Sequence, residues 1–268
     1  MALYIVPTPV GNLGDITRRA VDVLAQVDFI IAEDSRYSLK LLNHLGIKKK
    51  IVSHYRPKEE TQAEKIVAML ADRDGALITD SGTPGISDPG FILIRRAIAA
   101  GITVIPLPGP TAFVPALVAS GIDPRRFLFL GFPPRSRGEC RRFLLRIASL
   151  PYTLVFYESP RRLRDLLETA AAALGDREFA LAKEISKQHE TVIRSSLGRW
   201  QQALSGELIL GEMVLIIGGH PGSAAPEAAP HFETIDDLYA FFQERFGIGK
   251  NAMKKILMQK KAKSPAGR

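Results

Sequence analysis

Short apolar runs alternate with longer amphipathic segments along the first 120 residues, and this alternation limits the choice of fold more than any other feature. Strands are expected at Leu3–Val6, Phe29–Ala32 and Ala76–Thr79, which are short, apolar and bounded by polar or turn residues. Between the first two lies Ile16–Val27, whose apolar residues recur at helical spacing after a capping residue, Asp15. Buried strands separated by helices predict a mainly parallel sheet covered on both faces.

The same pattern continues to residue 120. Two further strands are expected at Ile51–His54 and Thr103–Pro106. One helix is expected to follow Glu33–Arg36 and to end near His44. Three further helices are expected at Thr61–Ala71, Phe91–Ala100 and Thr111–Ser120.

A second series of elements begins at Phe127, after a Gly-Ile-Asp-Pro turn at residues 121–124. The strands expected in it are Phe127–Gly131, Thr153–Tyr157, Phe179–Lys183, Glu190–Arg194 and Met213–Ile217. The expected helices are Arg142–Ser149, Leu163–Leu174 and Leu197–Leu204. Two strands in direct succession near Lys183–Arg194 indicate a mixed sheet. The predicted fold class is therefore α/β, with two α/β domains, residues 1–121 and 122–221, joined near residue 121.

The end of the chain differs in composition and charge from the rest. Residues 222–231 are rich in Pro, Gly and Ala and are typical of a linker, and residues 232–268 are expected to form a small basic helical extension. Arg245–Arg268 holds eight Lys or Arg and no acidic residue. Removing these eight from the 36 basic residues leaves 28, which equals the 28 acidic residues, so the tail carries the whole net charge of +8. Such a tail suits a polyanion such as nucleic acid, although a solvated terminus has the same composition.

Other features exclude several classes of protein. Cys140 is the only cysteine, so the chain has no internal disulfide, and no paired Cys or His ligands indicate a metal site. The N-terminus has no basic leader, so no signal peptide is expected. The stretch between Arg96 and Asp123 is uncharged and long enough to cross a bilayer, but its four prolines rule out a continuous helix. We therefore expect a cytoplasmic protein with no membrane segment and no metal.

Four unusual loops follow predicted strands, where ligands bind in open α/β sheets. They are Pro7–Asp15, Asp80–Gly90, Leu107–Ala112 and Phe156–Arg162, and none matches a Walker phosphate-binding loop. Proline has no N–H to offer a phosphate. Loops rich in proline present carbonyl oxygens and apolar rings, which suit an adenine and a positively charged sulfonium better than a triphosphate. The alternative is that Pro and Gly only build rigid turns.

The order of these motifs resembles the ribosomal RNA small subunit methyltransferase I family, within the tetrapyrrole-methylase-like class of S-adenosylmethionine enzymes. The resemblance spans about residues 3–218. It rests on Leu3–Val6, Thr8–Thr17, Glu33–Arg36, Asp80–Gly90, Pro108–Ala112, Phe156–Pro160, Lys183–Lys187 and His189-Glu190. The sequence departs from the family pattern at Ser35, at residues 54–60 and at Ser195-Ser196, which bears on substrate contacts more than on the cofactor site.

The resemblance implies two α/β domains with an S-adenosylmethionine cleft between them, pairing as a homodimer. It also implies methylation of the ribose 2′-oxygen of a cytidine in the decoding region of 16S rRNA, with naked rRNA or the small subunit as partner. The implied cofactor contacts are Pro9, Val10, Asp80, Gly82, Thr83, Pro84, Ile86, Ser87, Thr111, Ala112, Phe156, Tyr157 and Met213. A methyltransferase of a tetrapyrrole-like metabolite and a non-catalytic RNA-binding protein are the alternative functions.

A ribose hydroxyl is a better nucleophile when a base accepts its proton. Glu33 and Asp34 follow a strand and are candidates for this base, but such a pair equally often caps a helix. Lys183 and Glu184 are candidates too, with a simple buried ion pair as the alternative. For Glu158, capping the helix after Pro160 is an equal alternative to a role as the base, and for Asp88 the alternative is bracing its own loop. The sequence therefore assigns no base.

Arginines cluster after Pro133-Pro134, and two more belong to the cleft loop Phe156–Arg162; all are candidate phosphate contacts. Ordinary surface arginines of helices look the same in a sequence. The candidates for binding RNA are Arg135, Arg137, Arg141 and Arg142, Arg161 and Arg162, and Lys250, Lys254 and Lys255 of the tail.

Overall fold

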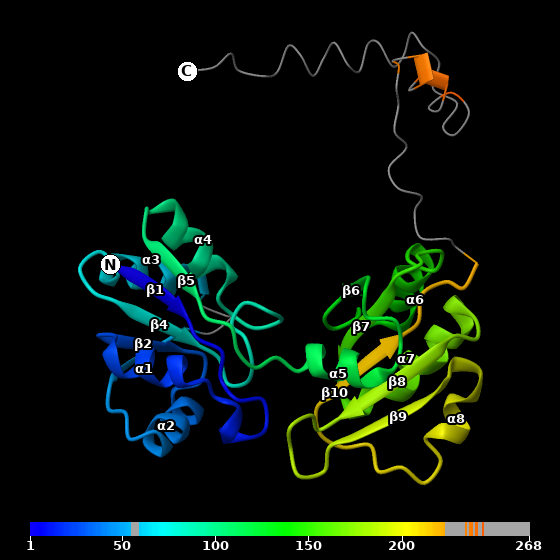
Figure 1. Cartoon of the computed structure of the whole chain (residues 1–268), viewed down its shortest axis with the longest axis horizontal. Helices are drawn as coiled ribbons and strands as arrows, with labels where there is room; N and C mark the ends of the chain where they lie inside the picture. The colour runs from blue at the N-terminus through cyan, green and yellow to red at the C-terminus, as the bar shows by residue number, and fades with distance from the viewer. Residues whose placement is uncertain (55–58, 223–233, 235, 238, 241–242, 244–268) are drawn as a thin grey trace. The chain divides into compact units, whose positions relative to one another are not determined.

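The computed structural model describes residues 1–54 and 59–222, and beyond these only residues 234, 236, 237, 239, 240 and 243. Met1–Ser223 form one compact unit, and Ala224–Arg268 are a separate one. The first unit contains two five-stranded sheets (Figure 1). Both lie in the part of the chain where the sequence predicts α/β domains, so the predicted fold class is confirmed.

The first sheet is entirely parallel. Its strands lie in the order β3-β2-β4-β1-β5. They are β1 (Ala2–Ile5), β2 (Phe29–Ala32), β3 (Lys50–Ser53), β4 (Gly75–Ile78) and β5 (Thr103–Pro106). Because all five run the same way, the loops after them lie at one edge of the sheet.

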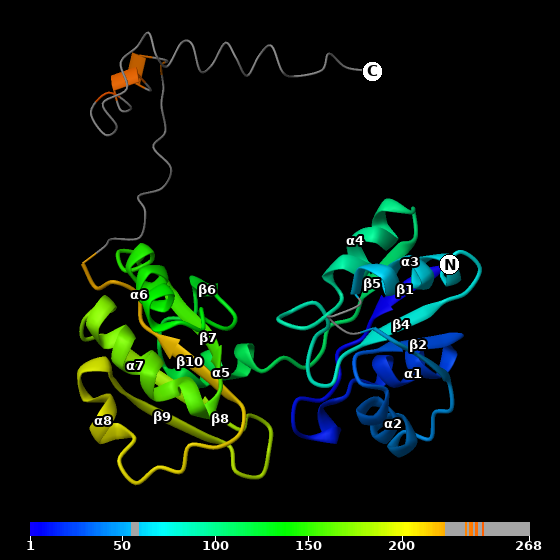
Figure 2. The same ribbon diagram turned by 180° about the vertical axis from the view of Figure 1, so that it is seen from behind.

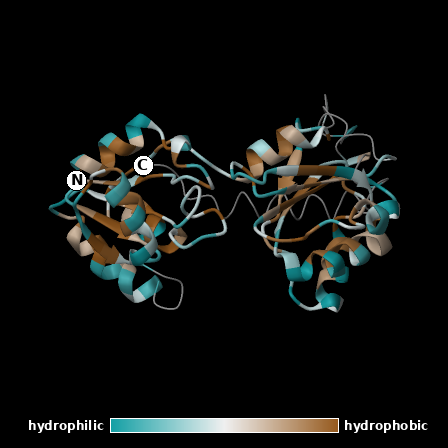
Figure 3. Ribbon diagram, turned by 90° about the horizontal axis from the view of Figure 1, so that it is seen from below, coloured by the Kyte–Doolittle hydropathy of each residue, from teal (hydrophilic) through white to brown (hydrophobic). Residues whose placement is uncertain are grey.

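Helices cover both faces of this sheet, as an apolar parallel sheet requires. They are α1 (Arg18–Gln26), α2 (Ser35–His44), α3 (Glu59–Met69) and α4 (Phe91–Ala99). On one face, Leu24 of α1 and Leu42 of α2 pack against Ile30. On the other, Ile66 of α3 and Leu93 of α4 pack with Phe29 and other buried residues. Figure 3 shows the hydrophobic colour concentrated on the strands between these helices.

The second sheet is mixed, as predicted, with the order β6-β7-β10-β8-β9. Its strands are β6 (Phe127–Phe129), β7 (Thr153–Glu158), β8 (Glu178–Lys183), β9 (Thr191–Ser196) and β10 (Met213–Ile217). Strand β10 runs antiparallel to both β7 and β8, between which it lies. Its first residue, Met213, therefore lies opposite the last residues of its neighbours, Glu158 and Lys183.

The helices of the second sheet are divided unequally between its faces. One face packs against residues of α6 (Arg137–Arg146), α7 (Pro160–Leu174), the 3-10 turn η3 (Leu197–Arg199) and α8 (Trp200–Ala203). Figure 2 shows helices α6, α7 and α8 beside the second sheet, in the view opposite to Figure 1. The opposite face packs against α5 (Phe113–Ser120) through Ala116 and Leu117. A boundary near residue 121 would assign α5 to the first sheet, whereas its contacts are with the second. The chain therefore passes from one sheet to the other before α5, within the loop after β5.

Helix α1 begins differently from the prediction. Asp15 belongs to the 3-10 turn η1 (Leu13–Asp15), and the N-cap is Thr17, whose hydroxyl oxygen accepts a hydrogen bond from the Ala20 N–H at 3.1 Å. Thr17 has the extended backbone that an N-cap needs, with φ −76° and ψ 148°. The predicted cap at Asp15 is wrong, because Asp15 ends the 3-10 turn and lies two residues before the N-cap.

The second unit is described only at isolated positions. Thr234 Oγ1 accepts a hydrogen bond from the Asp237 N–H, and the Asp237 carboxylate accepts one from the Thr234 N–H, the reciprocal pattern of a capping box. The described residues Asp236, Asp237, Tyr239, Ala240 and Gln243 are helical, which agrees with the expected helical extension. Most of that extension lies outside the described residues, as do the linker after residue 222 and Lys250, Lys254 and Lys255. No helix in the described part of the chain is long and apolar enough to cross a bilayer.

Phe156 gives a test of the core of the second sheet. Its side chain is fully buried among Leu163, Leu167 and Leu215. We expect Phe156→Ala to lower the free energy of unfolding by about 3–5 kcal/mol, because it removes a buried ring and leaves a cavity. Urea denaturation measures this, with Leu208→Ala, which truncates a side chain 73% exposed, as the control. A loss no larger than that of the control would contradict the burial of this ring.

Candidate functional site

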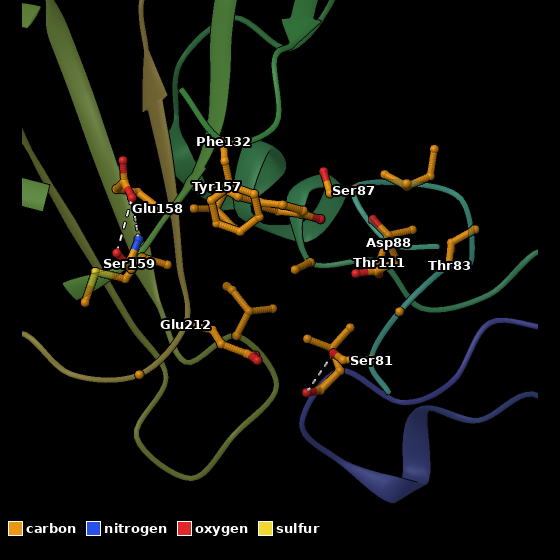
Figure 4. A pocket seen from close by; sticks show the side chains of 18 of the residues that line it. Ser81, Thr83, Ser87, Asp88, Thr111, Phe132, Tyr157, Glu158, Ser159 and Glu212 are labelled. Atoms are coloured by element: carbon orange, nitrogen blue, oxygen red, sulfur yellow. Dashed lines mark hydrogen bonds between the residues drawn. The ribbon is translucent and has the colours of Figure 1, made fainter. Parts of the chain in front are cut away.

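A pocket of about 290 Å³ lies among loops of both sheets (Figure 4). From the first sheet it takes residues of the loops after β1, β4 and β5, and from the second it takes the end of β7 and the start of β10. Its volume is close to the lower limit of about 300 Å³ for small-molecule sites. The lining residues are Val10, Ser81, Gly82, Thr83, Ile86, Ser87, Asp88, Thr111, Ala112, Phe132, Tyr157, Glu158, Ser159, Pro160, Ile185, Gly211, Glu212, Met213 and Val214.

Hydrogen bonds join the three loops of the first sheet. Thr8 and Gly82 exchange two backbone hydrogen bonds, of 2.9 and 3.0 Å, which form an isolated antiparallel bridge beyond the ends of the parallel strands β1 and β4. Thr83 Oγ1 donates to the Pro110 carbonyl oxygen at 3.0 Å. The loops after β1, β4 and β5 are thereby held together before any ligand binds.

Gly82 occupies a position that favours glycine. Its φ is +81°, in the left-handed region where a β-carbon is strained. Within 4 Å a β-carbon there would meet only the Pro110 carbonyl oxygen and a Val10 methyl, both at 3.9 Å. The backbone of Gly82 therefore forms part of the pocket wall, and any larger side chain would extend from that wall.

The loops of the two sheets approach each other closely at Gly11. A β-carbon on Gly11 would overlap Lys187 Cγ and would lie 3.0 Å from the Ile185 carbonyl oxygen. The Ser186 hydroxyl also contacts the Asp15 carboxylate across the same junction. This junction brings Val10 and Ile185 onto one wall of the pocket.

The charge of the pocket wall comes from carboxylates. Asp88, Glu158 and Glu212 line it, and no Lys, Arg or His is among its described lining residues. Two of these carboxylates have cationic partners outside the lining: Arg162 lies 3.2 Å from Glu158, and Lys187 lies 3.1 Å from Glu212. A phosphate chain in this pocket would face carboxylates with no cation beside it, whereas a positively charged ligand would be attracted.

Glu158 is the most deeply buried of the three. Its side chain is fully buried, and Oε1 accepts the Ser159 N–H at 2.8 Å. Oε2 faces Arg162 but has no partner with hydrogen-bond geometry in the described part of the chain. This carboxylate is therefore buried behind the pocket wall, against the Arg162 guanidinium.

Tyr157 lies between Phe129 and Phe132, with ring centroids 5.0 and 5.7 Å away. Burial raises the pKa of its phenol to about 12, and the nearby Asp88 carboxylate acts in the same direction. The hydroxyl therefore stays protonated near neutral pH and is no general base.

Comparison with known proteins identifies this architecture. Residues 2–200 match the model of the tetrapyrrole (corrin/porphyrin) methylases. A ribosomal RNA small subunit methyltransferase I from Escherichia coli O157:H7 is 41% identical over 272 residues, covering 96% of this chain and 94% of the relative. One from Haemophilus influenzae is 42% identical over 266 residues, covering 94% of each. The chain belongs to the tetrapyrrole methylase family. Within it, the chain belongs with the ribosomal RNA small subunit methyltransferase I relatives, which confirms the resemblance seen in its motifs.

Solved structures with the tetrapyrrole methylase fold are similar in shape. A conserved hypothetical protein from Aeropyrum pernix K1 superposes with a TM-score of 0.65 at 20% identity, covering 82% of this chain and 84% of that one. A uroporphyrin-III-C-methyltransferase from Thermus thermophilus superposes with a TM-score of 0.57 at 20% identity, covering 82% and 96%. At this identity the likeness shows the shared fold.

The structure brings together most of the cofactor residues that the family resemblance implies. Nine of them line the pocket: Val10, Gly82, Thr83, Ile86, Ser87, Thr111, Ala112, Tyr157 and Met213. Pro9 and Pro84 are buried outside it. The wall thus consists mainly of small, hydroxyl and carboxylate side chains, and Pro160 is its only proline within the described residues. The prolines of the first-sheet loops stiffen those loops rather than lining the pocket, which corrects the proline-lined wall expected from the sequence.

Two further cofactor candidates lie outside the pocket lining. Phe156 points into the core of the second sheet, because successive residues of a strand face opposite sides and Tyr157 faces the pocket. A cofactor contact by the Phe156 side chain is therefore ruled out. Asp80 lies beside β2, where its Oδ1 accepts the Asp34 N–H at 3.3 Å. Burial raises the pKa of Asp80.

None of the four candidate bases lines the pocket. Asp34 is the N-cap of α2, and its hydrogen bonds with the Arg36 side chain and backbone lower its pKa to about 2. Lys183 pairs with Glu207 at 2.6 Å, and Glu184 pairs with Lys187 at 3.0 Å, so Lys183 and Glu184 do not form the pair with each other that was considered. Partial burial acts to raise the pKa of Glu184, but hydrogen bonds from the Glu212 N–H and Lys187 outweigh it and the pKa is lowered. Glu33, next to Asp34, is likewise absent from the pocket lining.

The arginine candidates fall into two groups. Arg135, Arg137, Arg141, Arg142 and Arg161 are exposed, and Arg137 pairs with Glu168 of α7 at 2.8 Å. Arg162 is half-buried and donates to the carbonyl oxygens of Pro133 and Pro134 at 2.9 and 3.1 Å. These hydrogen bonds, both from Nη2, make Arg162 a positioning residue for this loop.

Several lining residues were not predicted from the sequence. Ser81, Asp88, Glu158 and Ser159 lie within the loops already singled out, where neighbouring positions were chosen instead. Gly211 and Glu212 come before a strand, and the usual rule considers only residues after a strand. The antiparallel direction of β10 brings this start to the same edge. Phe132 follows the short strand β6 and had no polar signal to reveal it.

His54 is connected to a loop of the pocket through Glu59. Its side chain is fully buried, and neither ring nitrogen has a hydrogen-bond partner in the described part of the chain. Glu59 lies 3.7 Å from it and accepts the Gly90 N–H at 2.9 Å, which holds the end of the loop that contributes Gly82 to Asp88. Burial lowers the pKa of His54, although the Glu59 carboxylate acts against this.

This burial predicts a pH dependence of stability. The unfolded chain binds a proton at His54 below a pKa of about 6.5, whereas the folded chain resists it, so the free energy of unfolding falls as the pH drops below that value. We expect the wild type to lose more stability between about pH 7 and 5.5 than His54→Leu, which has no group to titrate there. Urea denaturation at both pH values measures the difference, and parallel losses in the two proteins would contradict it.

Proposed function

We propose that the chain is a methyltransferase that uses S-adenosylmethionine to methylate the ribose 2′-oxygen of a cytidine in 16S rRNA. The observation that carries the proposal is the pocket wall, whose described residues include three carboxylates and the backbone of Gly82 but no lysine, arginine or histidine. Such a wall fits a cationic sulfonium and a neutral nucleoside, and it disfavours a phosphate chain. The membership of the tetrapyrrole methylase family supports the same cofactor.

The side chains present fit the parts of that cofactor. Val10, Ile86 and Met213 offer apolar surface for an adenine. Asp88 and Glu212 offer carboxylate oxygens for ammonium or hydroxyl groups. When bound, S-adenosylmethionine supplies a methyl group activated by its positive sulfur. The protein's contribution is then to exclude water and to align the acceptor oxygen with that methyl group.

Two observations support an RNA substrate: the names of similar proteins and the excess of basic residues in parts of the sequence. The 41–42% identical relatives are named for ribosomal RNA of the small subunit. Residues 135–168 hold eight arginines against four carboxylates, and the tail adds eight further basic residues. A small metabolite would need neither. With an rRNA substrate, we place the protein in the cytoplasm, and we propose the homodimer that the family resemblance implies.

Gly82→Trp tests the pocket and the activity together. The indole would extend from the pocket wall, so we expect calorimetry to show no binding of S-adenosylmethionine, and transfer of labelled methyl to unmodified small subunits to cease. Gly101→Trp is the matched control, because Gly101 has a similar φ of +76° and lies in open space. Cofactor binding retained in Gly82→Trp would overturn the assignment of this pocket.

The wild-type reaction separates the candidate substrates. Small subunits, naked rRNA and a tetrapyrrole are each incubated with labelled cofactor, and the methylated nucleotide is mapped. We expect label at a cytidine ribose. Label on the tetrapyrrole alone would replace the proposed function with the metabolite reaction, and binding of RNA without any transfer would leave only an RNA-binding protein.

The basic tail makes a separate prediction. Deleting residues 245–268 removes eight positive charges, so we expect weaker binding to rRNA and a flatter dependence of the binding constant on salt. Filter binding or fluorescence anisotropy over a range of salt concentrations gives this slope. An unchanged slope would show that the tail makes no contact with phosphates.

A further inference from the structure

Phe132 is an exposed aromatic residue at the edge of the pocket. Its side chain is 56% exposed, yet it lines the pocket beside Tyr157, with ring centroids 5.7 Å apart (Figure 4). Leaving a phenyl ring in water costs free energy that burial would recover. Its place next to the candidate reaction site suggests that a ligand covers it.

The backbone around Phe132 is held in place on both sides. Before it, the Gly131 carbonyl oxygen accepts the Tyr157 N–H at 3.0 Å. After it, Arg162 donates to the carbonyl oxygens of Pro133 and Pro134. Arg162 is itself oriented by Glu158, 3.2 Å away and fully buried. The ring is therefore presented by a fixed loop, and little conformational entropy is lost when a ligand covers it.

Exposed arginines lie on the segments that follow Phe132 and on the helix after the pocket strand β7. Arg135 follows it by three residues, and Arg141 and Arg142 lie exposed on α6, which begins at Arg137. Arg161 is exposed on the neighbouring helix α7. An aromatic platform beside several arginines is the combination by which proteins hold unpaired nucleotides, because the ring stacks on a base and the arginines contact phosphates.

We propose that Phe132 is the stacking platform for the base of the acceptor nucleotide, held unpaired at the mouth of the cofactor pocket. The proposal rests on the proposed function and adds to it the residue that receives the substrate. Phe132 acts by positioning: a base on its ring places the attached ribose at the pocket edge, while the arginines hold the flanking phosphates. Arg162 and Glu158 position the loop.

Kinetics of Phe132 variants test the platform. We expect Phe132→Ala to lower kcat/KM for small subunits by about 10-fold or more, the usual effect of removing one stacking contact, with unchanged calorimetric affinity for S-adenosylmethionine. Phe132→Trp should retain activity, and Phe132→Leu should behave like Phe132→Ala because it is apolar without a stacking face. Phe91→Ala is the control, since Phe91 is 62% exposed on α4 and lines no part of the pocket. Full activity of Phe132→Ala would overturn the platform. A loss of affinity for S-adenosylmethionine as large as the loss of kcat/KM would also overturn it, because the ring would then contact the cofactor.

Fluorescence of Phe132→Trp gives a readout independent of methyl transfer. A base stacked on the indole should quench its emission when an rRNA fragment with an unpaired cytidine is added, whereas Trp200 alone in the wild type should not respond. Absence of quenching despite measured RNA binding would contradict the platform. The two proposals fail differently: a wild type that transfers no methyl group to RNA refutes the proposed function, while an active wild type with equally active Phe132→Ala refutes the platform only.

Discussion

The backbone pairing of Thr8 with Gly82 is the interaction on which the site depends. It joins the loops after β1 and β4 beyond the ends of the strands, and Thr83 extends the connection to Pro110 after β5. Each loop would lose too much conformational entropy to hold its shape alone. Joined, they form one surface, and the left-handed backbone of Gly82 leaves that surface without a side chain at the point where a ligand approaches. The carboxylates can then act on a ligand at defined distances.

The mixed second sheet completes the pocket in a way that a parallel sheet would not. Every residue that the first sheet contributes to the pocket lining lies in a loop that follows the carboxyl end of a strand. In the second, β10 runs against its neighbours, so its start brings Glu212 and Met213 beside the end of β7 with Tyr157 and Glu158. Two of the three pocket carboxylates therefore come from adjacent strands running in opposite directions. Their partners, Arg162 and Lys187, lie outside the lining and keep the cost of placing like charges together low.

The sequence predicts the layout well because the layout follows from periodicity. The strands Phe29–Ala32, Thr103–Pro106 and Met213–Ile217 have the limits that their apolar runs indicate. The choice between Phe156 and Tyr157 could not be made in this way, because β7 is covered on both faces and its residues are apolar in succession. Likewise, Asp34 and Arg162 look like functional residues in the sequence, and only their contacts show that one caps α2 and the other braces a loop.

Prolines illustrate how one residue type serves a site indirectly. Their abundance in the loops marks the edge of the sheet where the pocket lies. Pro9 and Pro84 are nevertheless buried, and Pro133 and Pro134 present carbonyl oxygens to Arg162 rather than to the pocket. By limiting the backbone conformations of the loops, prolines hold Val10, Gly82 and Phe132 in place at the pocket.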